Sequence, residues 1–311
     1  MNVTTLVVAL VVLVVTGVAM LLAAAPLALA LARRRGRAEG IFVGASDALE
    51  TAARVDALVL DTSGTVTTGS LRVVQVEPID PEHDRNLRWF AAALAHTSDS
   101  PVEQAVAKLA ARGRVTDVVA TPGLGLSGAV DRHPVRLGRP DWIGLVALDG
   151  VGTTVGVEVD GRPLGRLVVA DVVREHAAEV VGSLASDGVR VELVSAGPAV
   201  DTAHVAEQSG VEHWHAEADD ARRAEVVERL RASGRVVGLV GSAAVPGADL
   251  WLGPVGSGAA LELDDLDVRR VARALALGRG TVATRARVRR LAFLVAPTLG
   301  VLTYLMASLS R

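Results

Sequence analysis

Short apolar segments alternate with longer amphipathic segments over the C-terminal half of the chain, and this pattern limits the possible folds. We expect helices at 172–187, 198–209, 219–233 and 266–279, with strands at 189–195, 211–215 and 235–240 between them. Strands that alternate with longer helices predict a parallel sheet covered by helices on both faces. Ligands of such sheets bind beyond the carboxyl ends of the strands.

Another expected strand, earlier in the chain, ends in an acidic residue. Residues 56–61 read Asp-Ala-Leu-Val-Leu-Asp, and a polar loop rich in hydroxyl groups follows at 62–69. Ser195 and Gly241 also stand at predicted strand ends. We therefore expect three loops to meet at one edge of the sheet, with Asp61 as the carboxylate among them.

Between these two regions the pattern changes to mixed helices and strands. Apolar residues recur at helical spacing over 85–94 and 101–111, whereas 121–137, 155–159 and 164–169 look like strands with Gly-rich turns. Residues 76–152 are expected to form a small inserted α+β domain. The sheet domain would then consist of residues 35–75 and 153–284.

Two apolar runs enclose this body. Val3–Ala32 and Leu291–Leu309 each have the length of a membrane-spanning helix, and Arg-rich segments lie on their inner flanks. Because Lys and Arg mark the cytoplasmic side, these runs predict a two-pass protein of the cell membrane with both termini outside and the body in the cytoplasm. A signal peptide and a buried C-terminal helix are the alternatives for the two runs. The expected spans and flanks occupy residues 1–34 and 285–311.

Composition narrows the kinds of function. The net charge is −3, which gives no reason to expect a nucleic-acid partner. The absence of Cys excludes disulfides and thiolate metal sites. Half of the residues are hydrophobic, which agrees with a lipid bilayer as one partner.

The loop after the first strand matches a known signature. Asp61-Thr62-Ser63-Gly64-Thr65-Val66-Thr67 resembles the Asp-Lys-Thr-Gly-Thr-Leu-Thr sequence of P-type ATPases, which belong to the haloacid-dehalogenase superfamily. Ser98-Asp99-Ser100-Pro101, Gly123-Leu124-Gly125 and Asp171-Val172-Val173-Arg174 resemble further motifs of the heavy-metal-transporting branch, in the same order. The resemblance implies a haloacid-dehalogenase-like doubly wound sheet with a nucleotide-binding-type insert.

The same resemblance assigns roles to individual residues. Asp61 corresponds to the aspartate that takes up the γ-phosphoryl group of ATP, and hydroxyls at Ser63, Thr65 and Ser195 could cradle phosphoryl oxygens. Arg223 stands where the family has a second Lys, but its planar fork differs from an ammonium group. Gly123 and Gly125 are weak candidates for nucleotide contact, and a hairpin turn explains them equally well.

Several parts of the family's machinery are missing. Thr62 replaces a Lys, Ser195-Ala196-Gly197 replaces Thr-Gly-Asp, and Gly241-Ser242-Ala243-Ala244-Val245-Pro246 replaces a segment whose acidic residues hold Mg²⁺. Asp249 is the weak candidate for a substitute metal ligand. Losing the metal should cost about 10³-fold in rate or more, so ATP and Mg²⁺ are expected to bind weakly if they bind at all.

Two smaller patterns have structural explanations. Ser100 to Glu103 reads as an N-cap, a Pro at the first helical position and a capping-box Glu. His213 and His215 should share one face of a strand, either as surface or satisfied side chains or as a metal site.

Together these observations predict a degenerate, P-type-ATPase-like membrane protein that acts through binding, as partner or regulator of another membrane protein. A slow phosphotransferase that forms a phospho-aspartate at Asp61 is the first alternative. Half of a split metal-ion transporter, with other helices supplied by a second chain, is the second. Ala25-Pro26-Leu27 stands where the family has Cys-Pro-Cys, so the soft-metal ligands are missing.

Overall fold

The computed structural model describes residues 3–45 and 47–309. Two sheets organise the chain, and contacts divide it into two units. The first unit comprises residues 1–60, 184–191 and 220–311; the second comprises residues 61–183 and 192–219.

The seven-stranded sheet has the order β1-β13-β12-β11-β2-β9-β10. Its strands are β1 (Ile41–Val43), β2 (Ala57–Asp61), β9 (Arg190–Val194), β10 (His213–His215), β11 (Val237–Val240), β12 (Leu250–Pro254) and β13 (Leu261–Leu263). After the edge strand β1, the chain forms β2, adds β9 and β10 on one side of it, and then adds β11, β12 and β13 on the other. This order confirms the doubly wound α/β sheet.

Parallel pairing dominates this sheet. β11 pairs in parallel with both β2 and β12, β12 pairs in parallel with β13, and β10 pairs in parallel with β9. β1 alone among the described pairs runs antiparallel, against β13. The residues of β11 and residues 57–60 of β2 are all buried, which explains their continuous apolar sequence.

The helices that accompany this sheet follow the predicted alternation. They are α2 (Ala48–Arg54), α5 (Ala177–Ser186), α6 (Ala199–Ser209) and α7 (Asp220–Ala232). The helix expected at 172–187 begins later than predicted, because Asp171-Val172-Val173 continues a strand that pairs with Thr67–Leu71. Such a pairing is non-local and leaves no periodicity in the sequence.

The second sheet is antiparallel throughout and has the order β3-β8-β7-β6-β5-β4. Its strands are β3 (Thr67–Pro78), β4 (Val115–Thr121), β5 (Gly125–Val130), β6 (His133–Gly138), β7 (Thr153–Val159) and β8 (Arg162–Val173). Helices α3 (Asp84–Ala95) and α4 (Pro101–Ala107) and the short turns η2 (Pro81–His83) and η3 (Asp141–Ile143) complete the α+β arrangement.

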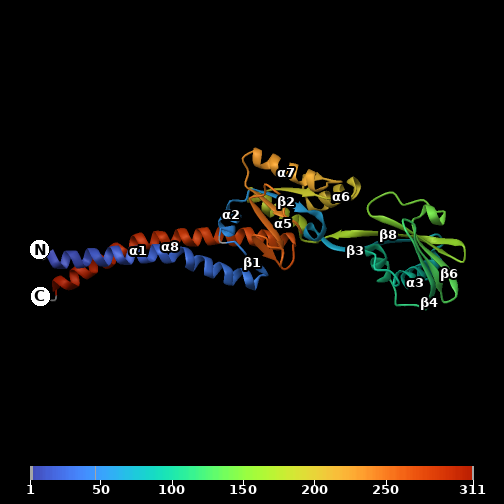
Figure 1. Ribbon diagram of the computed structural model, residues 1–311, viewed down its shortest axis with the longest axis horizontal. Helices are drawn as coiled ribbons and strands as arrows, with labels where there is room; N and C mark the ends of the chain where they lie inside the picture. Colours follow the sequence, from blue (N-terminus) through green and yellow to red (C-terminus); the bar gives the residue numbers. More distant parts are fainter. Residues whose placement is uncertain (1–2, 46, 310–311) are drawn as a thin grey trace. The chain divides into compact units, whose positions relative to one another are not determined.

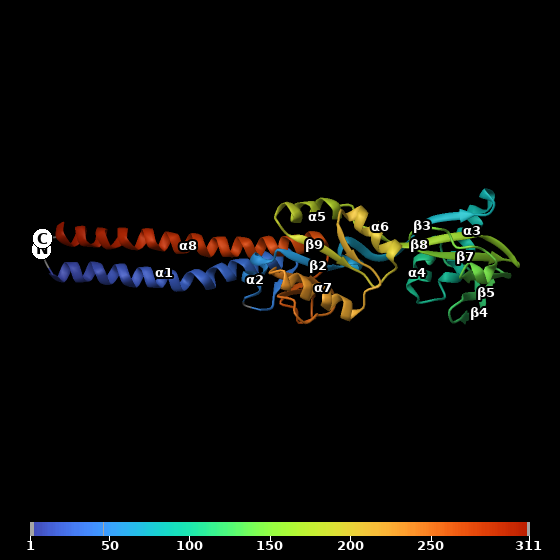
Figure 2. The ribbon, with the colours of Figure 1, turned by 90° about the horizontal axis from the view of Figure 1, so that it is seen from above.

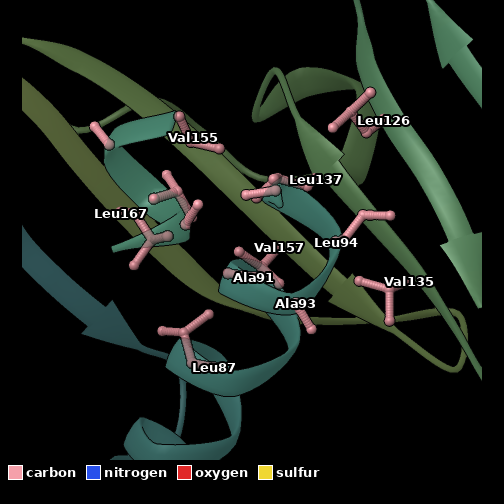
Figure 3. Close-up of a cluster of buried hydrophobic side chains, with 14 of the residues drawn as sticks. Leu87, Ala91, Ala93, Leu94, Leu126, Val135, Leu137, Val155, Val157 and Leu167 are labelled. Atoms are coloured by element: carbon pink, nitrogen blue, oxygen red, sulfur yellow. The ribbon is translucent and has the colours of Figure 1, made fainter. Parts of the chain in front are cut away.

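Helix α3 supplies one half of the core of this α+β region. Leu87, Ala91 and Leu94 are fully buried and face side chains from β5 to β8, among them Leu137, Val157 and Leu167 (Figure 3). The recurrence of these helical residues at intervals of three and four explains why the sequence pattern located the helix correctly. The expected capping box on α4 is wrong in one respect: Ser100 makes no side-chain cap bond.

Two long helices belong to the first unit. α1 (Val3–Ala38) and α8 (Val268–Leu309) run antiparallel beside each other, with the start of α1 and the end of α8 at the same end (Figures 1 and 2). No helix in the described part of the chain combines the length and apolarity of a membrane span. Many side chains in the two expected spans, Val3–Ala32 and Leu291–Leu309, lie outside the described residues.

Candidate active site

Asp61 is the last residue of β2, and a tight turn, η1 (Thr62–Val66), leads from it directly into β3. Ser63 and Gly64 break the helical conformation of this turn, with φ/ψ of −73°/127° and 80°/−8°. The positive φ explains the glycine at 64, because a Cβ there would have no other atom within 4 Å but would strain the backbone.

Two threonine hydroxyls close the turn against nearby carbonyl groups. The Oγ1 of Thr65, a fully buried residue, donates to the carbonyl oxygen of Asp61. The Oγ1 of Thr62 donates to the carbonyl oxygen of Val194, the last residue of β9, at 3.3 Å. Because β2 and β9 are neighbours in the sheet, this bond fastens the Asp61 turn to the strand end that precedes Ser195.

The carboxylate of Asp171 gathers the remaining hydroxyls of this segment. It accepts from Ser63 Oγ at 3.2 Å, Thr67 Oγ1 at 2.6 Å and Thr68 Oγ1 at 3.1 Å. A carboxylate only accepts hydrogen bonds, so all three hydroxyls donate to it. The antiparallel pairing of Thr67 with Val173 brings Asp171, near the end of β8, into this position.

Arg174 holds the same turn through its backbone carbonyls. Its Nε donates to Thr67 O at 2.9 Å, its Nη2 to Gly64 O at 3.2 Å, and its backbone NH to Val66 O at 2.9 Å. Sequence reasoning matched Asp171 and Arg174 to a family motif but did not include them among the site residues. The signal that could have found them is the Asp-x-x-Arg spacing at the end of the return strand.

Ser195 lies in a second turn, directly after β9. Its Oγ accepts from Gly197 N at 3.0 Å, while its backbone NH donates to His215 O at 2.9 Å. Ser195 therefore fixes the backbone between β9 and α6, at the strand end next to Asp61. Of the three loops expected to meet, the structure connects these two by the bond from Thr62 to Val194.

Gly241 follows Val240, which pairs with Leu60 in the register between β11 and β2. The backbone of Gly241 is held on both sides, because its NH donates to Leu252 O at 3.2 Å and its carbonyl accepts from Trp251 Nε1 at 3.1 Å. The segment Gly241–Pro246 contains no Asp or Glu. This strand end therefore offers backbone and hydroxyl groups but no carboxylate.

Asp249 is poorly placed for the role suggested for it. Its Oδ2 accepts from Val237 N at 2.8 Å, and Arg231 Nε lies 3.7 Å from Oδ1. Val237 is the first residue of β11, so Asp249 lies at the amino ends of β11 and β12, at the opposite edge from Leu60 and Val240. Asp249 and a ligand held beyond the carboxyl ends of these strands would therefore lie at opposite edges of the sheet.

Arg223 lies in the first turn of α7. Its side chain is only 14% exposed, and Nη1 lies 3.5 Å from Asp220 Oδ1. Arg223 therefore places a mostly buried positive charge on α7, where the resemblance leads us to expect a Lys.

The two candidate nucleotide glycines have different physical explanations. Gly125, at φ 146°, packs against β6 so tightly that an added Cβ would lie 2.2 Å from Leu137 O. Gly123, at φ 75°, occupies the turn between β4 and β5 with open space around it. Strand packing alone therefore requires Gly125, and nucleotide contact remains a prediction for both.

His215 is a satisfied side chain. Its Nε2 lies 3.0 Å from the Oε2 of Glu192, which is fully buried on the neighbouring strand β9, whereas His213 is exposed. Among the residues that the structure describes, no group of three His, Asp or Glu side chains could hold a metal ion.

The model of the haloacid dehalogenase-like hydrolase family matches residues 55–249, more than half of the chain. The chain belongs to this family. The match covers the Asp61 turn, the Asp171–Arg174 return and the strand ends at Ser195 and Gly241.

Comparison with individual proteins shows that this family member is P-type-ATPase-like. It is 36% identical over 287 residues to a copper-exporting P-type ATPase of Mycobacterium tuberculosis, covering 84% of this chain and 38% of that protein. It is 29% identical over 280 residues to a copper-transporting ATPase of Helicobacter felis, again covering 84% of this chain and 38% of the relative. The chain thus spans well under half of these relatives.

Solved structures support the fold. A zinc-transporting PIB-type ATPase in the E2.Pi state superimposes with a TM-score of 0.76 at 21% identity, covering 92% of this chain and 51% of that chain. The catalytic domain of the CPx-ATPase CopB-B superimposes with a TM-score of 0.60 at 16% identity, and the match covers 80% of this chain and 98% of that chain.

The residues of this site do not fit a magnesium ion held in the usual way. Mg²⁺ needs one or two carboxylates beside phosphate oxygens. Asp61, the position of the expected nucleophile, is left as a single carboxylate: the Gly241–Pro246 segment supplies none, Asp249 lies at the other edge of the sheet, and three hydroxyls donate to Asp171. We therefore derive no reaction step that depends on Mg²⁺.

Proposed function

We propose that this protein is a membrane-anchored, P-type-ATPase-like protein with an impaired phosphoryl-transfer site, acting as partner or regulatory subunit of another membrane protein. The observation that carries the proposal is the strand end at Gly241, which has a fixed backbone but no carboxylate. The family's nucleophile position is present at Asp61, while the charge that should assist it is missing.

Hydrogen bonds hold the Asp61 turn in one conformation. Five side chains of the segment and its return strand, those of Thr62, Ser63, Thr65, Asp171 and Arg174, hold the turn through hydrogen bonds. Such a turn suits binding a phosphoryl group or a partner's segment. The hydroxyl of Thr62, where P-type ATPases carry a Lys, is used to fasten the turn to β9 and supplies no positive charge.

The membrane location rests on α1 and α8. Their apolar segments lie side by side in antiparallel helices, so that both ends fall on the same side. Large apolar side chains on both helices are exposed, including Leu22 at 72% and Leu291 at 56%. Exposed apolar surface of this kind needs a lipid or protein environment, and a two-pass anchor with the body in the cytoplasm provides it.

Phosphorylation of the purified full chain tests the proposal. The protein is incubated with Mg²⁺ and γ-labelled ATP, beside an Asp61→Asn variant and a P-type ATPase as positive control. We expect no acid-stable, hydroxylamine-labile label above that of the variant. Label that appears in the wild type and is lost in the variant would overturn the impaired-site proposal.

That second result would favour a slow phosphotransferase that forms a phospho-aspartate at Asp61, which the ordered turn permits. Half of a split metal-ion transporter is the further candidate, because similar proteins are named copper-exporting and copper-transporting ATPases. A co-purifying membrane protein that supplies further helices would favour it. An ATP-induced rise in unfolding temperature without label would instead indicate a nucleotide-responsive regulator.

A further inference from the structure

Eight of the arginines on the helix pair α1 and α8 form two clusters, four on each helix. The arginine belt consists of Arg33, Arg34, Arg35 and Arg37 on α1 and Arg285, Arg287, Arg289 and Arg290 on α8. All eight residues are exposed. A belt this dense concentrates positive charge over about two turns of each helix.

Packing between the helices explains why the belt faces outward. Ala28, Ala32 and Gly36 recur every four residues along α1, and all three are buried. A Cβ added at Gly36 would lie 3.1 Å from the Cδ2 of Leu277 on α8. The small side chains therefore form the face that packs on α8, and the arginines between them are left on the remaining surface of α1.

Helices α1 and α8 carry no acidic residue of their own, and the nearest one along the chain is Glu39, directly after α1. The sequence has no Asp or Glu between residues 1 and 38 or between residues 268 and 311. Glu50 of α2 forms an ion pair with Arg285. Seven further guanidinium groups then face solvent without an acidic neighbour on their own helix, which creates a strong field for an anionic partner.

The surroundings of the belt indicate which anionic partner fits. On α1 the residues before the belt expose large apolar side chains, among them Val14, Val18 and Leu22, and on α8 the residues after it expose Leu291, Val301 and Leu305. Because the helices are antiparallel, both apolar segments lie on the same side of the belt (Figure 2). A nucleic acid would gain nothing from that apolar surface, whereas a phospholipid offers a phosphate and acyl chains side by side.

We propose that the arginine belt binds the phosphate groups of anionic phospholipids at the membrane surface. Arginine forms bidentate, charge-assisted hydrogen bonds with phosphate, and each basic residue at a membrane surface adds to the attraction for anionic headgroups. This inference rests on the membrane location in the proposed function, but it does not depend on the state of the Asp61 site.

The experiment uses the full chain in micelles of a non-ionic detergent, with phosphatidylglycerol or phosphatidylcholine added at equal amounts. The readouts are the unfolding temperature and the affinity for a fluorescent phosphatidylglycerol. The belt variant replaces Arg33, Arg34, Arg35 and Arg37 by Gln. The matched control replaces four exposed arginines of the second unit, Arg112, Arg114, Arg132 and Arg162, and so makes the same change in net charge.

We expect phosphatidylglycerol, and not phosphatidylcholine, to raise the unfolding temperature of the wild type and of the control. The belt variant should bind the fluorescent lipid at least about tenfold more weakly. A second variant, Arg289→Gln with Arg290→Gln, should lose less affinity for the fluorescent lipid. Because it changes other residues of the belt, a loss in both variants is not explained by misfolding of one of them. Molar salt should weaken binding in the wild type, since the charges are exposed.

Equal effects of the two lipids, or an unchanged belt variant, would overturn the proposal. The same stabilisation by inorganic phosphate at matched concentration would show a soluble-anion site, and stronger stabilisation by single-stranded RNA would show a nucleic-acid surface. Resistance of the chain to alkaline extraction from membranes tests the anchor separately. Failure of that test with retained phosphatidylglycerol selectivity would remove the two-pass anchor and leave the lipid site.

Discussion

At the scale of single residues, Asp171 determines how the Asp61 turn is held, because three hydroxyl groups converge on its carboxylate. Thr67 is the most constrained of them, since it is fully buried and its Oγ1 also lies 3.0 Å from Thr62 O and accepts from Gly64 N at 3.3 Å. A hydroxyl has one hydrogen, so the short contact with the charged acceptor takes it. Sequence reasoning identified the hydroxyl-rich loop but could not identify the acceptor of its hydroxyl groups, because Asp171 lies 104 positions after Thr67.

Replacing Thr67 by Val tests this arrangement. The change keeps the volume, removes the shortest of the three hydrogen bonds to the Asp171 carboxylate and takes away the acceptor of the Gly64 NH. We therefore expect a loss of about 1–3 kcal/mol in the free energy of unfolding. Thr68→Val is the matched control, because Thr68 is only partly buried and its loss should cost about 1 kcal/mol or less. Denaturant unfolding of both variants gives the comparison. Equal costs for the two would contradict the special role of Thr67.

At the scale of elements, sequence periodicity identified those strands and helices whose own residues carry the pattern. α3, α6, α7 and strands β9 to β11 lie close to the positions expected for them. The strands β1 and β13 were missed because each has three residues and is fixed by pairing with the other across more than 200 positions. The end of β8, Val172 and Val173, was read as the start of a helix for the same reason. Non-local pairing, which leaves no local periodicity, accounts for these failures.

A pair of glycine variants separates strand packing from nucleotide contact in the β4–β5 hairpin. Gly125→Ala places a Cβ against Leu137 O and should cost about 3 kcal/mol or more, because the β5–β6 ladder must open. Gly123→Ala has open space and should cost about 1 kcal/mol of backbone strain. Thermal unfolding with and without ATP measures both quantities. If Gly123→Ala abolishes an ATP-induced shift while the fold persists, the nucleotide prediction for Gly123 gains its support.

At the scale of the whole molecule, the chain combines a doubly wound sheet with an α+β region and places Asp61 at the end of β2, while the segment Gly241–Pro246 after β11 contains no carboxylate. The fold could be predicted because many weak motifs occur in the right order. Whether the site has a metal ligand was harder to predict. Asp249 stands only three positions after Pro246 in the sequence, but it lies at the amino ends of β11 and β12, whereas Gly241 follows the carboxyl end of β11.

Ser242→Asp restores a carboxylate at the position where the family's acidic residue stands, and it tests whether that loss limits the chemistry. Ser242 is exposed, so the substitution should leave the unfolding temperature nearly unchanged. A metal ion contributes several kcal/mol in the transition state and each ~1.4 kcal/mol is tenfold, so we expect at least about a tenfold rise in Mg²⁺-dependent label at Asp61. Ser242→Asn, which adds an amide in place of the charge, is the control. Absence of label in Ser242→Asp, with ATP binding intact, would show that the missing lysine at Thr62 limits the site as much as the missing metal ligand.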